Sequence, residues 1–252
     1  MSPPPANPVL RALLAAASPE RAVHLRRFFK TGPGEYGEND RFLGVMVPQI
    51  RAIVRENRAS ASLAAARTLL DSPWHEAREA GLFLLDDLFR AATPAERTRL
   101  HAAYLTALRQ GRVNNWDLVD ASAPTLVGQY LLDSAPAPLP RKFPLLDDLA
   151  RAPALWENRV AVVATLAFIR RGRLAPAFRQ CSAALGHPHD LMHKAVGWML
   201  RECGKKDPAA LRDFLAARLP ALHPTALRYA IERFPAPERR QWLALRRAAT
   251  AR

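Results

Sequence analysis

The chain has 252 residues, 49% of them hydrophobic, which suffices for one sizeable core and falls short of two ordinary domains with a linker. Lys and Arg number 37 against 23 Asp and Glu, and the net charge of +14 favours a polyanionic partner, with nucleic acid first. Two cysteines outside any C-x-x-C pair exclude a disulfide framework and a zinc ribbon, and no apolar run approaches the ~18 residues of a membrane span, so we expect a cytoplasmic protein without membrane contact.

The N-terminal region begins with several prolines and has no charged segment before an apolar core, so it does not resemble a signal peptide. We expect residues 1–18 to form a flexible segment. The stretch "KTGPGEYGEND" at 30–40 contains three glycines whose spacing fits no Walker motif. It predicts a turn between two helices, with Lys30, Tyr36 and Arg41 in contact with DNA.

Helical periodicity dominates the rest of the chain, because apolar residues such as Leu82, Leu85 and Phe89 recur at three- and four-residue intervals. No segment shows sustained alternation with hairpin turns, so we predict an all-α fold. The last segment, 236–252, predicts a basic amphipathic helix that serves as a solubilising cap rather than as a membrane anchor. The helical runs are separated by proline-bearing breaks at 93–94, 134–140, 187–190, 206–208, 222–224 and 234–237.

Five of the predicted helices align on an alanine within a repeated local pattern: Ala80, Ala121, Ala161, Ala195 and Ala230. The spacings between successive alanines are 41, 40, 34 and 35 residues. Periods of this size are typical of helical-pair solenoids of the HEAT, armadillo or TPR kind. We therefore predict that residues 1–252 form a single domain, a curved right-handed solenoid of HEAT-like repeats with a basic groove on its concave face.

The repeat register places three residues on one stripe of this concave face and a fourth beside it. Relative to the aligned alanine, Trp116 is at −5, Asp120 at −1 and Trp198 at +3, and Arg159 at −2 lies one step around its helix. In a solenoid these side chains from three repeats could converge. The same face would bring further basic residues to a DNA backbone, namely Arg78, Lys194, Arg201 and Arg228.

A tryptophan and an aspartate four residues apart suit the cleavage of an N-glycosidic bond. A fixed carboxylate supports an oxocarbenium-like transition state and orients water, while indole faces pack on sugar or stabilise positive charge. A base made cationic by alkylation leaves as a neutral heterocycle and needs little general-acid help. Two structural alternatives stand beside this hypothesis: Trp116 could be a core residue, and Asp120 could form an inter-repeat salt bridge with Arg159.

The sequence also resembles a known family in segments 28–56, 114–120 ("NNWDLVD"), 156–163 ("WENRVAVV") and 193–208. These segments resemble the AlkD family of HEAT-like-repeat DNA alkylation repair enzymes, over roughly residues 20 to 235. The resemblance implies a monomeric, monofunctional DNA glycosylase that needs no metal or cofactor. Its substrates would be cationic N3- and N7-alkylated purines in duplex DNA, such as 3-methyladenine and 7-methylguanine, and it would act in base excision repair.

Position by position, the resemblance implies that Asp120 positions water and supports the oxocarbenium ion. It implies that the indoles of Trp116 and Trp198 contact the deoxyribose, and that Arg159 contacts the DNA backbone near the lesion. Two departures stand out: Asn158 replaces an expected basic residue, which puts one phosphate contact in doubt, and the 134–144 stretch is longer than usual.

Other functions stay open on the sequence alone. The main alternative is a non-catalytic repeat scaffold that binds nucleic acid or an acidic protein through the same face. Another is a metal-dependent phosphodiesterase built on His187, His189 and His193, which lack a carboxylate or cysteine at helical ligand spacing. Lys194 could in principle form a Schiff base with an exposed sugar, but a phosphate contact is the favoured interpretation.

Overall fold

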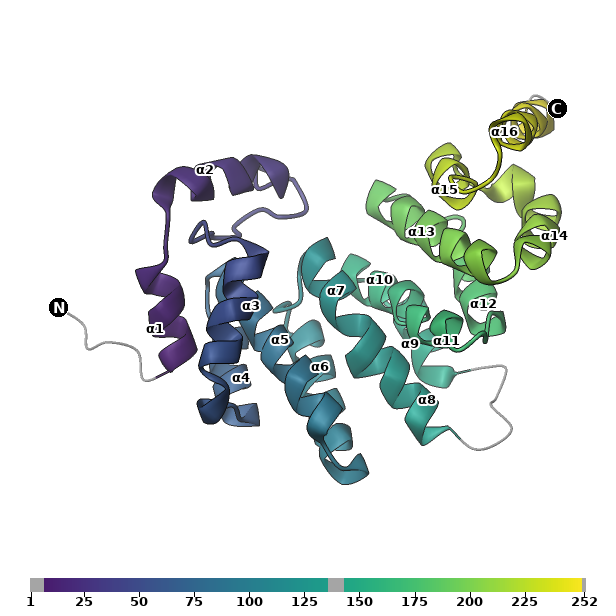
Figure 1. The fold of residues 1–252 in the computed structure, drawn as a ribbon. Helices are drawn as coiled ribbons and strands as arrows, with labels where there is room; N and C mark the ends of the chain where they lie inside the picture. Colours follow the sequence, from purple (N-terminus) through teal and green to yellow (C-terminus); the bar gives the residue numbers. More distant parts are fainter. Residues whose placement is uncertain (1–6, 136–142, 251–252) are drawn as a thin grey trace. The chain divides into compact units, whose positions relative to one another are not determined.

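The computed structural model describes residues 7–135 and 143–250 (Figure 1). The chain divides into two compact units, Met1–Ser122 and Ala123–Arg252. Within the described ranges the secondary structure is helical, apart from an isolated β-bridge between Arg41 and Trp74. The all-α prediction is therefore confirmed. The prediction of one curved domain with a concave groove concerns the placement of the two units and stays a prediction.

The first unit is built around the long helix α5, His75–Ala91, which is buried along most of its length. Helices α3 and α4 both pack on α5, and α1 packs on α3 and α5 (Figure 1). The elements of this unit are α1 Pro8–Ala15, α2 Pro19–Phe28, α3 Val47–Glu56, η1 Arg58–Ser60, α4 Leu63–Leu70, α5, α6 Pro94–Arg109 and α7 Trp116–Ala123.

Helix α1 corrects the expectation of a flexible N-terminal segment for the residues from 7 onward. The Asn7 side chain accepts hydrogen bonds from the amides of Val9 and Leu10, which caps the helix, and its Nδ2 donates to the carbonyl of Ala65 at 3.0 Å. Val9 and Leu13 are buried. Because the helix is both capped and packed, this part of the chain is ordered, whereas residues 1–6 lie outside the described ranges.

The second unit centres on α13, Asp190–Lys206, which packs most extensively against α15. A Cβ at Gly197 would lie 2.5 Å from the Cβ of Tyr229, so only glycine permits this close helix contact. The elements are η2, a π-helical stretch over Pro124–Gln129, α8 Tyr130–Ser134, α9 Pro144–Arg151, α10 Leu155–Val163, α11 Leu166–Arg170, α12 Ala175–Ala183, α13, α14 Pro208–Arg218, η3 Leu219–Ala221, α15 Pro224–Ala230 and α16 Ala236–Thr250.

The predicted proline-bearing breaks separate helices, and α6, α14 and α15 begin at the prolines Pro94, Pro208 and Pro224 of these breaks. The break at 134–140 lies largely outside the described residues. The basic helix predicted at the C-terminus is α16, up to Thr250. Both cysteines are buried free thiols, as expected. No helix in the described ranges is long and apolar enough to cross a membrane.

All five aligned alanines lie on helices, namely α5, α7, α10, α13 and α15. Four of them are fully buried or nearly so, as a repeated packing position requires. The exception is Ala121, which is half-buried. The α7 surface around Ala121 therefore faces an opening in the first unit and not a packed core.

Candidate functional site

A cavity of about 370 Å³ opens in the first unit between α2, the loop before α3, α3, α5 and α7. Five aromatic side chains and four carboxyl groups line it. The aromatic residues are Phe28, Phe29, Phe42, Phe83 and Trp116. The carboxyl groups are those of Glu76, Glu79, Asp117 and Asp120, and His75 and Arg51 complete the polar lining. The cavity is at the small end of the roughly 300–1,000 Å³ range of small-molecule sites.

Stacked rings form one wall of this pocket. Three successive ring pairs are stacked. The ring centroids of Trp116 and Phe29 lie 5.5 Å apart, and those of Phe29 and Phe42 lie 5.0 Å apart. The centroids of Phe42 and His75 lie 4.7 Å apart. The rings of Phe28 and Trp116 form an edge-to-face pair with centroids 5.8 Å apart. Phe28 is 59% exposed and lies at the rim of the pocket. Trp116 therefore combines the two alternatives considered for it, because it packs on a small core cluster and also lines an open cavity.

A buried polar network holds α7 against α5. His75 lies between two carboxylates, with Nδ1 2.8 Å from Asp40 Oδ2 and Nε2 2.8 Å from Asp117 Oδ2. Asp40 also accepts a hydrogen bond from Arg78, whose guanidinium donates to Asn114 Oδ1 as well. This network fixes the first turn of α7, the helix that carries Trp116 and Asp120.

The network carries paired charges inside the unit. Burial by itself would lower the pKa of His75, but the carboxylates of Asp117 and Asp40 outweigh it and raise this pKa to about 10. Burial would raise the pKa of Asp40, but the hydrogen bonds and charges of His75 and Arg78 keep it below its ordinary value. His75 is therefore an imidazolium at neutral pH, and both its ring nitrogens donate.

Glu76 fixes the loop that closes the pocket. Its carboxylate accepts hydrogen bonds from the amides of Leu43, Gly44 and Val45 at 2.8, 2.7 and 3.3 Å. Gly44 has φ +82°, and a Cβ there would lie 2.1 Å from the carbonyl oxygen of Ser18. The loop conformation therefore depends on one carboxylate from α5 and one glycine.

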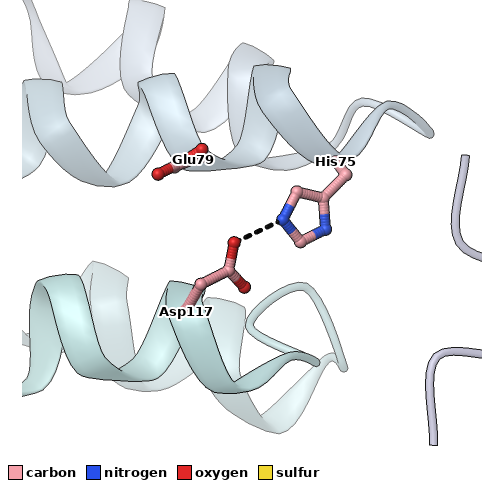
Figure 2. A group of neighbouring side chains, drawn as sticks. All are labelled: His75, Glu79 and Asp117. Atoms are coloured by element: carbon pink, nitrogen blue, oxygen red, sulfur yellow. Dashed lines mark hydrogen bonds and ion pairs between the residues drawn. The ribbon is translucent and has the colours of Figure 1, made fainter. Parts of the chain in front are cut away.

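Glu79 lies one helical turn after His75 and faces Asp117 of α7 (Figure 2). The residue is only 4% exposed, and within the described residues its carboxyl has no hydrogen bond or ion pair. Burial raises its pKa to about 8; the charges of Asp117 and Glu76 add to this rise and those of His75 and Arg51 oppose it. At neutral pH Glu79 is therefore mainly a neutral carboxylic acid beside the cavity.

His75 and three further carboxyl groups line the same pocket as Asp120, although the sequence analysis did not propose them as site residues. The repeat register could have identified these residues from the sequence. Helices α5 and α7 carry chemically similar residues at equivalent positions before their aligned alanines. The equivalent pairs are His75 with Trp116, Glu76 with Asp117, and Glu79 with Asp120, at −5, −4 and −1 respectively. All six line the cavity. Comparing residue types between repeats would have found them.

The nearest ligand atoms of His75, Glu79 and Asp117 lie within 4.8 Å of one another. A metal ion would need a lone pair on the imidazole, yet both ring nitrogens of His75 are hydrogen-bonded to carboxylates. This donor set therefore does not fit a metal ion, and it fits a charge-paired network.

Comparison with known proteins places the chain. Residues 9–234 match the sequence model of a family described as DNA alkylation repair enzymes. The chain belongs to this DNA alkylation repair family. Among solved structures it is similar to a predicted DNA alkylation repair enzyme from Enterococcus faecalis, with 16% identity, a TM-score of 0.66, and coverage of 87% of this chain and 97% of that one. At this identity the likeness shows a shared fold. No curated protein gives a significant match.

In this alkylation repair family member, two of the four predicted active-site residues lie at the pocket of the first unit. Trp116 and Asp120 are on adjacent turns of α7, both half-buried and both lining the cavity. Trp198 is half-buried on α13 in the second unit, and its convergence with the α7 residues stays a prediction.

Arg159, also in the second unit, differs from its expected placement. It is only 4% exposed, and its guanidinium donates to the carbonyl of Leu191 in the first turn of α13. The placement argues against direct contact with a DNA phosphate. It indicates that Arg159 positions α13, the helix of Trp198, relative to α10.

The predicted DNA contacts divide by exposure. The structure corrects the prediction that Arg78 contacts DNA. Its guanidinium is buried and donates to Asp40 and to the carbonyls of Ser72 and Pro73. Arg201 is half-buried and paired with Glu232. Tyr36 is half-buried, and Lys194 pairs with Asp190 at 2.7 Å. The side chains of Lys30, Arg41 and Arg228 are exposed.

The histidine cluster and Asn158 have structural partners. His193 Nε2 lies 2.7 Å from the carbonyl of His187, and His187 Nε2 lies 3.2 Å from Asn158 Oδ1. Asn158 is buried, and its amide donates to the carbonyls of Leu149, Ala150 and Ala152 at the end of α9. Asn158 thus caps the end of α9, at the position where the family resemblance led us to expect a basic residue.

Proposed function

We propose that this family member is a DNA glycosylase that excises cationic N3- and N7-alkylated purines, such as 3-methyladenine and 7-methylguanine, from duplex DNA. The observation that supports the proposal is that Trp116 and Asp120 lie one turn apart on α7 and both line an aromatic pocket, in a chain of the DNA alkylation repair family. The net charge of +14 supports a polyanionic substrate.

In the proposed reaction the bond between C1′ and the base nitrogen breaks, and its electron pair goes to the base. A base that carries a positive charge from alkylation leaves as a neutral heterocycle. The carboxylate of Asp120 stabilises the developing oxocarbenium ion and orients a water molecule, which adds to C1′ and loses a proton. The indole of Trp116, held by Phe28 and Phe29, presents a rigid surface to the sugar.

The buried network gives Asp120 a defined position. Asp117 is one turn before Asp120 on α7, and its bond to His75 fixes this helix relative to α5. Arg159 acts in the proposal as a positioning residue for α13, and Trp198 as the second indole. Exposed basic residues, including Lys30, Arg41 and Arg228, bind the DNA backbone.

The test is release of 7-methylguanine from methylated duplex DNA. We expect Asp120→Asn to reduce release by about 10²- to 10³-fold and to leave DNA affinity nearly unchanged, because the change removes a charge used in the transition state. Asp213→Asn on exposed α14 is the matched control and should retain full activity. Salt-dependent DNA binding without release of any alkylated base from the unmodified protein would instead favour the non-catalytic scaffold.

A further inference from the structure

Four of the chain's seven histidines form a cluster at the starts of α13 and α15 in the second unit: His187, His189, His193 and His223. The rings of His193 and His223 stack, with centroids 3.7 Å apart and planes 15° apart. His193 is 7% exposed, and the exposed His223 lies over it. The amide of His189 donates to Nδ1 of His187 at 3.1 Å, and Nε2 of His193 lies 2.7 Å from the carbonyl of His187. This four-histidine cluster therefore joins the first turns of two packed helices.

Two of these histidines are the N-caps of α13 and α15. Nδ1 of His189 accepts a hydrogen bond from the amide of Leu191 at 3.1 Å, and Nδ1 of His223 accepts one from the amide of Thr225 at 3.2 Å. An Nδ1 atom that accepts must hold a lone pair, so both rings are neutral, with their proton on Nε2. Protonation adds a hydrogen to Nδ1, and an N–H group then faces the amide N–H that it had bound. Each cap is therefore lost when its histidine is protonated.

The other helices with a side-chain N-cap use different residue types. Within the described ranges these helices are α1, α2, α4, α6 and α14, and their caps are Asn7, Ser18, Ser62, Thr93 and Asp207. Asparagine, serine, threonine and aspartate are the usual N-cap residues. Histidine differs from all four, because its ordinary charge change falls between pH 5 and 8. Among the capped helices of the described ranges, α13 and α15 thus have caps that respond to mild acid.

We propose that the four-histidine cluster is an acid-sensitive switch in the second unit. At neutral pH its rings are uncharged and hold the first turns of α13 and α15 in place. Protonation removes both caps and sets two positive rings, those of His193 and His223, against each other. The first turn of α13 then opens, and Arg159 loses its bond to the carbonyl of Leu191. The switch concerns order within the second unit and does not rest on the proposed glycosylase activity.

The surrounding charges favour the neutral form of the cluster. Asp190 is the carboxylate that acts on both His189 and His223, and it is paired with Lys194 at 2.7 Å. The cations that act on these two rings come from four helices, namely Arg159 of α10, Lys194 of α13, Arg228 of α15 and Arg246 of α16. Added protons therefore enter a region that already has more positive than negative charge.

The direction of the pH effect follows from these surroundings. Loss of water contact lowers the pKa of His187, His189 and His223 from the ordinary 6.5. The neighbouring His193 adds to the fall at each of them, and Asp190 opposes it at His189 and His223. Below pH 6.5 the unfolded chain therefore binds more protons at these residues than the folded chain. Their stabilising contribution is complete above pH 6.5 and is lost as pH falls through the folded pKa values.

Hydrogen exchange of the full chain tests the switch. Exchange is followed by mass spectrometry between pH 7.5 and 5.5, and protection is corrected for the intrinsic effect of pH on exchange. We expect the protection of segments 189–194 and 223–228 to fall about tenfold on acidification and to recover when pH is restored. The start of α14, capped by Asp207 in the same unit, is the internal reference and should change less than about twofold.

His189→Asn and His223→Asn replace each histidine by a residue that caps helices well and does not titrate in this range. The first variant should abolish the loss of protection at α13, and the second the loss at α15. His24→Asn on the exposed side of α2 is the matched control and should leave both losses unchanged. Constant protection in the unmodified chain, an equal loss at α14, or losses that persist in the two cap variants would each overturn the inference. The first two outcomes need no variant, so they decide the question even where a substitution impairs folding.

Discussion

The imidazole of His75 bonds Asp117 at 2.8 Å and thereby joins α5 to the helix that carries Trp116 and Asp120. The same ring contacts Asp40 on its other side. One buried cation thus fixes two acidic residues that are 77 positions apart in the chain. The geometry of the candidate site depends on this residue, although the proposed chemistry does not use it directly.

His75→Phe should keep the ring that stacks on Phe29 and Phe42 and remove the charge between Asp40 and Asp117. Asp117 then loses its charged partner and Asp40 keeps only Arg78, and we expect the free energy of unfolding to fall by about 3–5 kcal/mol. Urea denaturation measures the change. His24→Phe on the exposed side of α2 should stay within about 0.5 kcal/mol, and an equally small effect at His75 would show that the network contributes no net stability.

His75 should contribute measurably to the pH dependence of the free energy of unfolding. Its pKa is 6.5 when the chain is unfolded and about 10 when folded, so the folded protein binds more protons between these values. The stabilising contribution is complete below pH 6.5 and is lost as pH rises toward 10. Thermal melts in this window should show a decline that His75→Phe reduces, and a decline of the same size in that variant would exclude His75 as its source.

We predict that replacing Glu79 by an uncharged residue stabilises the protein. Its pKa rises from 4.5 unfolded to about 8 folded, so stability falls as pH increases between these values. Glu79→Gln removes this loss, and we expect it to stabilise the protein on the order of 1–3 kcal/mol at pH 8. Urea midpoints at pH 5 and pH 8 test the expectation: the gain should be large only at pH 8, and a destabilised variant at pH 8 would contradict it.

Gly44→Ala should open the loop that closes the pocket. The substitution combines a positive φ with a Cβ that meets the backbone of Ser18 and Ala22. Gly34→Ala is the matched control, because its φ of +73° is similar and nothing lies within 4 Å of the added carbon. We expect the positive φ to lower the free energy of unfolding by about 1–3 kcal/mol in both variants. At Gly44 the contact with the backbone should lower it further. Equal losses would show that the close approach is unimportant.

Exposed and buried basic residues should differ in their effect on DNA binding. Lys30→Gln and Arg41→Gln should each weaken binding for all sequences and reduce the slope of log affinity against log salt by about 1. Arg78→Gln should lower stability, because Asp40 loses a partner, and should leave that slope unchanged in the folded protein. A reduced slope for Arg78→Gln would restore Arg78 to the set of phosphate contacts.

The sequence by itself determined the helices and the residues of the proposed chemistry. Helical periodicity is a local property, so it predicted an all-α chain and a helix that carries both Trp116 and Asp120. The repeat register also held the equivalence of Glu79 and Asp120, which comparison of the repeats reveals. Local rules gave no measure of burial, and for that reason Arg78 was expected at the surface.

Only the tertiary structure decided which polar residues face one another. The loop at 40–46 brings Asp40 against His75 and Arg78, and this contact spans 35 residues of sequence. The two neighbouring carboxylates then make His75 an imidazolium with a pKa of about 10, and burial makes Glu79 a neutral glutamic acid beside an aromatic cavity. Charge states inside a protein depend on desolvation and on neighbours from distant segments, and a linear pattern of residues encodes neither.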